Sequence, residues 1–71
     1  MMDKDTMCFV LNSFMFEPNT KEERANVIRE LERLGEGIKI EDHTTERMAH
    51  EGMVSFCVND GNTSCWVGVG L

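Results

Sequence analysis

The sequence predicts a small α+β fold: a four-stranded, mainly antiparallel sheet with one helix on one face, in the order β-α-β-β-β. Three patterns indicate this fold. An apolar segment spans residues 7–16, an amphipathic helical pattern spans residues 20–35, and an apolar hairpin spans residues 52–71. With 71 residues, the chain has the length of one small domain, so we assign residues 1–71 to a single domain.

Residues 7–16, MCFVLNSFMF, are predicted to form the first strand. Alternate residues of a strand point to opposite faces, and here both alternating sets are apolar. Such a strand is typical of a sheet covered on both faces. Asn12 and Ser13 interrupt the apolar run and indicate a bulge or a polar contact.

The helix is predicted to begin after Thr20, which forms a capping box with Glu23. One face then carries apolar residues at helical spacing: Val27, Ile28, Leu31 and Leu34. Gly35 is expected to end the helix in a left-handed conformation. The charged residues between the apolar positions, Arg24, Arg29 and Arg33 among them, are expected to form a solvated surface.

Residues 38–41 alternate in polarity, as a half-buried second strand does. The polar segment 42–51 is predicted to be a loop or a single helical turn. The last two strands flank Asn59-Asp60-Gly61-Asn62, and a two-residue turn at Asp60-Gly61 is expected. That turn pairs Val58 with Thr63, Phe56 with Cys65, and Val54 with Val67. A type I turn with a glycine bulge would instead shift the pairing by one residue and mix the two faces.

Composition excludes several classes of partner. The net charge of −6 argues against nucleic acid and against an anionic membrane surface, because both require clustered cationic side chains. No apolar run approaches the length of a membrane span, and the N-terminal residues lack the pattern of a signal peptide. Three cysteines, an odd number, fit free thiols better than a disulfide framework. We therefore expect a cytoplasmic protein.

A partner is expected because a single helix can cover only one face of the predicted sheet. The other face would expose apolar groups, and the last strand lacks the charges that protect an exposed edge. The candidate interface residues are Trp66, Met53, Gly68, Gly70, Val69 and Leu71. A homodimer would bury these groups, and so would another protein. Alternatively, residues 42–51 fold back over the bare face.

Catalytic chemistry is not indicated, because no nucleophile motif accompanies the two histidines. The weak candidates for metal ligands are His43, His50 and Cys57, but they lack the paired spacing of zinc sites. No cofactor is expected. The sequence thus predicts a non-enzymatic, acidic, protein-binding protein, an inhibitor, adaptor or regulator that works as a homodimer, with a viral or mobile-element origin as a hypothesis. The alternative is a small-molecule or metal-binding domain that uses the Trp66–Gly68 sheet face and the loop from His43 to His50.

Overall fold

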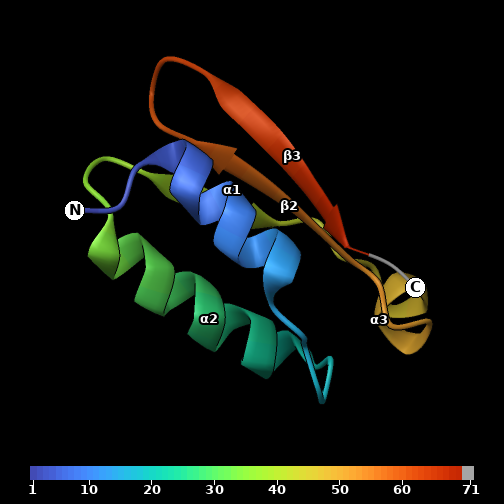
Figure 1. Ribbon diagram of the computed structural model, residues 1–71. Helices are drawn as coiled ribbons and strands as arrows, with labels where there is room; N and C mark the ends of the chain where they lie inside the picture. The colour runs from blue at the N-terminus through green and yellow to red at the C-terminus, as the bar shows by residue number, and fades with distance from the viewer. Residues whose placement is uncertain (70–71) are drawn as a thin grey trace.

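The computed structural model describes residues 1–69, and in this part of the chain three helices accompany one antiparallel sheet of three strands. The elements are α1 (Lys4–Ser13), α2 (Lys21–Leu34), β1 (Lys39–Asp42), α3 (Glu46–His50), β2 (Val54–Asn59) and β3 (Ser64–Val69), and the strand order is β1-β2-β3 (Figure 1). The α+β class is as expected, but the prediction of four strands and one covering helix is wrong.

The error lies in the first element, since most of the predicted strand 7–16 belongs to helix α1. Asp3 caps this helix by accepting a hydrogen bond from the backbone N–H of Thr6 at 2.8 Å. Met7 and Leu11, one helical turn apart, are both fully buried. The helix therefore turns the side that carries Met7 and Leu11 toward the core, although the exposed Phe9 is apolar as well.

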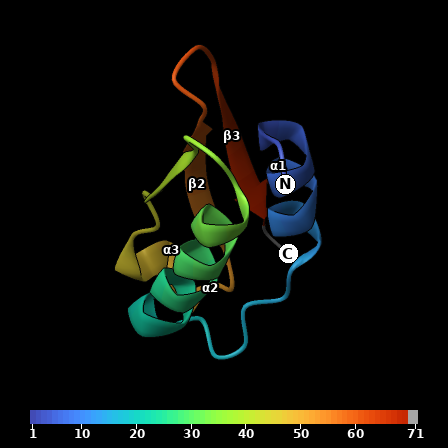
Figure 2. The same ribbon diagram turned by 90° about the vertical axis from the view of Figure 1, so that its left-hand side faces the viewer.

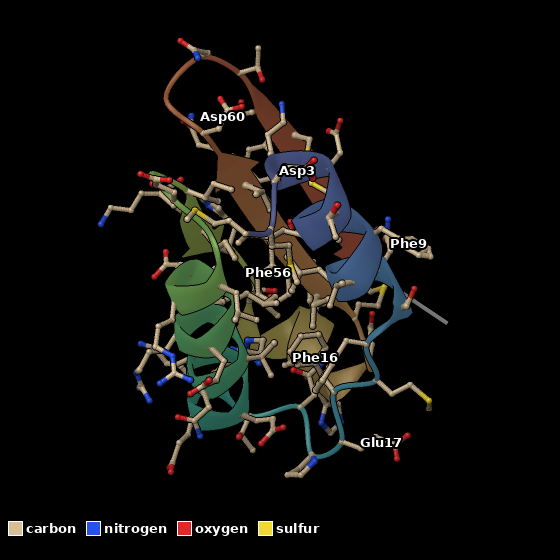
Figure 3. All side chains as sticks on the ribbon, turned by 60° about the vertical axis from the view of Figure 1, so that its left-hand side comes forward. Asp3, Phe9, Phe16, Glu17, Phe56 and Asp60 are labelled. Carbon is tan, nitrogen blue, oxygen red and sulfur yellow. A yellow bond between two sulfur atoms is a disulfide. The ribbon has the colours of Figure 1, made fainter. Side chains whose placement is uncertain are left out.

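Helices α1 and α2 cover the same face of the sheet, with α1 against β3 and β2 and α2 against β1 (Figures 1 and 2). The core lies between these two layers. Its buried members are Met7, Leu11, Leu31, Ile38, Ile40, Val54, Phe56, Val58 and Val67. Phe16 extends the core from the connection after α1, with its ring 5.5 Å from that of Phe56, whereas Phe9 points outward from α1 (Figure 3).

Helix α2 begins as predicted, because the Thr20 hydroxyl accepts a hydrogen bond from the N–H of Glu23 at 3.1 Å. It ends at Gly35, but Gly35 is not left-handed: its φ is −102°. A side chain at Gly35 would collide with the terminal methyl of Met7, so the glycine permits the close approach of α1 to the end of α2.

The hairpin pairs Val54 with Val69, Phe56 with Val67, and Val58 with Cys65. The pairing is thus shifted by two residues from the predicted register, and the turn is longer than two residues. A shift of two keeps every side chain on its expected face. Phe56, Val58 and Val67 accordingly lie in the core, while Trp66 lies on the opposite face.

None of the helices within residues 1–69 is both long enough and apolar enough to cross a membrane.

Candidate functional site

The sheet face opposite the two helices is the main candidate site, because no element within residues 1–69 covers it. Strand register arranges its side chains in three rows. Lys39, Asn59 and Ser64 form the first row, Glu41, Cys57 and Trp66 the second, and Ser55 and Gly68 the third, beside His43. We call these nine residues the open face. Most of them are polar, so the open face differs from the broad apolar surface expected from the sequence.

Trp66 is the exception among these polar residues, with 64% of its surface exposed. Its indole ring contacts the imidazole of His43 across the sheet, with ring centroids 4.9 Å apart and planes inclined at 58°. The His43 Nε2 lies 3.2 Å from the Oε1 of Glu41. The carboxylate and the indole therefore orient the histidine from two sides, and the histidine in turn holds the indole over the sheet.

Cys57 stands directly opposite Trp66 in the strand pairing and is only 8% exposed. Within residues 1–69 no helix packs over this face, so neighbouring side chains of the open face are the groups placed to shield the thiol. The centre of the open face is formed by the Trp66–His43 ring pair, with the buried Cys57 on the strand β2 between β1 and β3. An exposed indole on a sheet face is a frequent feature of protein contact sites.

The other predicted interface residues do not form one surface with Trp66. Gly68 does lie on the open face, and its position leaves open space, since the nearest atom to an added Cβ would be the Val54 carbonyl at 4.0 Å. Met53 lies before β2 and is half-buried, and its carbonyl accepts a hydrogen bond from the Asn19 side chain at 3.1 Å. Gly70, Leu71 and the side chain of Val69 lie outside the described part of the chain.

The two edges of the sheet differ. At the β1 edge, a carboxylate oxygen of Glu32 in α2 accepts the backbone N–H of Ile40 at 2.8 Å, so α2 covers part of that edge. Strand β3 forms the other edge, and within residues 1–69 its backbone pairs with β2 alone. It also carries no charged side chain. Edge strands without such protection can accept another strand.

The candidate metal ligands are not brought together. His43 lies beside Trp66, Cys57 is buried in β2, and His50 lies at the end of α3 against a groove beside α2. Among residues 1–69 there is no group of three or more histidine, cysteine or acidic side chains placed to hold a metal ion.

The cysteines depart from the expectation of free thiols. Cys8 of α1 and Cys65 of β3 form a disulfide, and their Cα atoms are 7.5 Å apart, which is wider than most disulfides span. Cys57, on the opposite face of the sheet, is free and buried. The predicted pairing of Phe56 with Cys65 already implied opposite faces for Cys57 and Cys65, and the observed pairing keeps them on opposite faces. The pairing with Cys8 was not predicted because the segment containing Cys8 was assigned to a strand.

Sequence reasoning also missed the role of Arg24, which was placed on a solvated helix face. Its side chain is 6% exposed and its Nε donates to an Oδ2 of Asp42 at 2.8 Å. Its Nη1 donates to the side-chain oxygen of Asn19 at 2.7 Å. Partial burial alone would raise the pKa of Asp42, but hydrogen bonds from Arg24 and Thr44 outweigh it and lower the pKa below its ordinary value.

Comparison of the chain with models of known protein families, with curated proteins and with solved structures found no match.

Proposed function

We propose that this chain is a non-enzymatic protein-binding protein that works as a homodimer, as an inhibitor, adaptor or regulator. The observation that carries this proposal is Trp66, a tryptophan that is 64% exposed and belongs to the unprotected edge strand β3. Tryptophan combines a large apolar area with few rotatable bonds, which makes it a frequent anchor of protein interfaces.

The β3 edge suits a symmetric arrangement. If β3 of one copy pairs antiparallel with β3 of a second, the two sheets join into one, and each Trp66 faces the same side of the joined sheet. The backbone hydrogen bonds of the edge would supply affinity, and the indole would supply apolar contact. This support differs from the argument made on sequence. Residues 7–13 belong to helix α1 rather than to a strand, so they add no apolar side to the open face, which is mostly polar.

The proposal includes no catalysis: the imidazole of His43 lies next to the Glu41 carboxylate and the tilted indole of Trp66, and within residues 1–69 it makes no hydrogen bond to a serine, threonine or cysteine side chain. A cytoplasmic location belongs to the same proposal. It predicts that Cys8 and Cys65 are thiols in the cell, because cytosolic proteins seldom keep disulfides. Alkylation of the chain in freshly lysed cells, followed by mass spectrometry, measures this: a quantitatively oxidised pair contradicts the cytoplasmic location.

Static light scattering over a range of protein concentrations tests self-association. We expect the mean mass to rise toward that of a dimer, and Trp66→Ala to weaken the association by about tenfold or more, as truncation of an interface anchor does. Phe9→Ala is the matched control. Phe9 is an exposed aromatic residue, 66% accessible, but it lies on the outer side of α1, away from the open face.

The melting temperatures of both variants complete the test. Removing an exposed side chain should leave the fold intact, so a large fall in melting temperature for Trp66→Ala would make Trp66 a structural residue rather than a contact. A wild-type chain that stays monomeric at every concentration would refute the homodimer. Equal weakening by Trp66→Ala and Phe9→Ala would refute the open face as the interface.

A further inference from the structure

A groove of about 1100 Å³ lies between the start of α2, the segment after β1, and α3. The residues with charged or amide side chains along it are Asn19, Lys21, Arg24, Asp42, Arg47 and His50, together with Glu46. The groove is on a different part of the molecule from Trp66, and the function proposed above makes no use of it.

Arg24 contributes an unused donor to this groove. Its Nε and Nη1 are bonded to Asp42 and Asn19, but its Nη2 donates to no protein atom within residues 1–69. The side chain as a whole is 6% exposed. In this part of the chain, no fully buried side-chain nitrogen or oxygen lacks a hydrogen-bond partner, so Nη2 must reach a surface. Arg24 lines the groove, and we infer that its Nη2 reaches the surface there.

The ion pair with Asp42 fixes the direction of the free donor. A guanidinium held at two of its nitrogens has lost the rotational freedom that an exposed arginine would lose on binding a ligand. Asp42 also offsets the charge of Arg24, so Arg24 supplies oriented donors here, and net positive charge must come from other side chains.

Lys21 and Arg47 supply that charge, against the single carboxylate of Glu46 that is left after Asp42 pairs with Arg24. Arg47 is 90% exposed, and its ion pair with Glu51 is long, at 3.6 Å, so its guanidinium is available. The groove is therefore cationic in a protein whose net charge is −6. The backbone N–H groups of Lys21 and Glu22, at the first turn of α2, also have no protein acceptor among the described residues.

We propose that this groove binds the oxyanion of a small molecule, a carboxylate or a phosphate group. One oxygen accepts from the Nη2 of Arg24, and the side chains of Lys21 and Arg47 reach the others from the two walls. Charge-assisted hydrogen bonds of this type are stronger than neutral ones, and an arginine fork suits the geometry of both anions.

Titration of the ¹⁵N-labelled protein with inorganic phosphate, and separately with malonate, tests the site by NMR. Chloride holds the ionic strength constant, so general screening does not contribute. We expect saturable shifts in the Nε–H signal of Arg24 and in the amides of Lys21 and Glu22. The anion that saturates first distinguishes a phosphate ligand from a carboxylate ligand.

The double variant Lys21→Gln/Arg47→Gln should weaken binding roughly three- to tenfold, as expected for two partly exposed charges. Both positions are exposed, so the fold should persist. Arg29→Gln/Arg33→Gln is the matched control, since it removes the same charge from exposed positions of α2 that do not line the groove.

Saturable shifts that weaken in the first variant and persist in the control support the site. Shifts that follow only the salt concentration, or equal weakening in both double variants, overturn it. Neither outcome bears on self-association through Trp66, which light scattering measures separately.

Discussion

Replacing Arg24 with alanine should cost far more stability than replacing any other arginine of α2. Arg24 joins the start of α2 to the end of β1, since it bonds Asp42 at 2.8 Å and the Asn19 side chain at 2.7 Å. Truncating one partner of a fully buried ion pair costs about 3–5 kcal/mol, because the other charge is left without compensation.

The cost here should be somewhat lower. The Asp42 side chain is 21% exposed and keeps a hydrogen bond from the Thr44 N–H at 3.0 Å, so its charge is not wholly abandoned. We expect about 2–4 kcal/mol for Arg24→Ala. A chain of 71 residues has a free energy of unfolding of roughly 4–10 kcal/mol. The substitution should therefore remove a large share of the total stability.

Urea denaturation followed by far-ultraviolet circular dichroism measures the loss. Tryptophan fluorescence is a poor probe, because Trp66 is already exposed in the folded state. Arg33→Ala is the control: Arg33 pairs with Glu30 at 2.8 Å, but the two side chains are 74% and 63% exposed. Exposed pairs of this kind contribute under about 1 kcal/mol.

Arg24→Met separates packing from polarity, because methionine keeps part of the apolar stem and none of the donors. If the polar contacts dominate, Arg24→Met should lie close to Arg24→Ala. The reasoning would be refuted if Arg24→Ala lowered the free energy of unfolding by no more than Arg33→Ala does. The comparison requires that the denaturant slope stay unchanged, because an unchanged slope means that the same amount of surface becomes exposed on unfolding in each variant.

Three further predictions concern stability. Hydrogen bonding lowers the pKa of Asp42 below 3.8. The stability that the ionised Asp42 contributes is therefore fully present above that pH and is lost as the pH falls through the folded-state pKa. Urea midpoints measured through this acid range should fall less steeply for Asp42→Asn than for the unchanged protein. Gly35→Ala should lower the free energy of unfolding by about 1–3 kcal/mol through overpacking. Gly68→Ala is the control, because the added methyl would meet open space. Equal urea midpoints for the two variants would contradict the packing argument. The disulfide joins Cys8 and Cys65, which are 57 positions apart in the sequence. Its reduction should lower the free energy of unfolding by about 4 kcal/mol. The variant with serine at both positions should melt at the same temperature with or without reductant.

The sequence predicted α2, β1 and the hairpin because each has a clear pattern. The first segment had no such pattern. Residues 7–16 are apolar in nearly every direction, and periodicity alone does not separate a buried strand from a buried helix in a short apolar run. The better signals were the cap at Asp3, which lies outside the segment considered, and the spacing of four between Met7 and Leu11. Val10 is its only β-branched residue, which also favours a helix.

The register of the hairpin was missed for a different reason. A two-residue turn at Asp60-Gly61 is a common hairpin solution, but the side chains favour a longer loop. The Asp60 carboxylate accepts from the N–H groups of Asn62 and Thr63, each at 2.9 Å, and the Asn59 side chain accepts from the Gly61 N–H. These bonds stabilise a loop in which Ser64, rather than Thr63, begins the returning strand. The side chains of β2 and β3 still lie on the sheet faces that the predicted pairing implied, because the pairing is shifted by an even number of residues.

The helical spacing of the sequence already indicated that Arg24 lies on the buried side of α2. Residues 24, 27, 28 and 31 follow the spacing of one helix face, so Arg24 belongs to the stripe that carries Val27, Ile28 and Leu31. Assigning residues to faces by polarity alone placed Arg24 in solvent. A charged residue on an apolar stripe indicates a buried partner, and here that partner, Asp42, is supplied by the end of β1.

The second helix changes what kind of association is expected. A core lacking cover would make the dimer obligate, because the separated chain could not bury its apolar residues. Here α1 and α2 complete the core within one chain, and what remains is an open strand edge with one large aromatic side chain. Edge pairing of folded units is governed by mass action, so dilution should separate the copies without unfolding them. The circular dichroism spectrum should accordingly stay constant across the concentration range in which the scattering mass falls, whereas a loss of structure in parallel with the mass would restore the obligate interface.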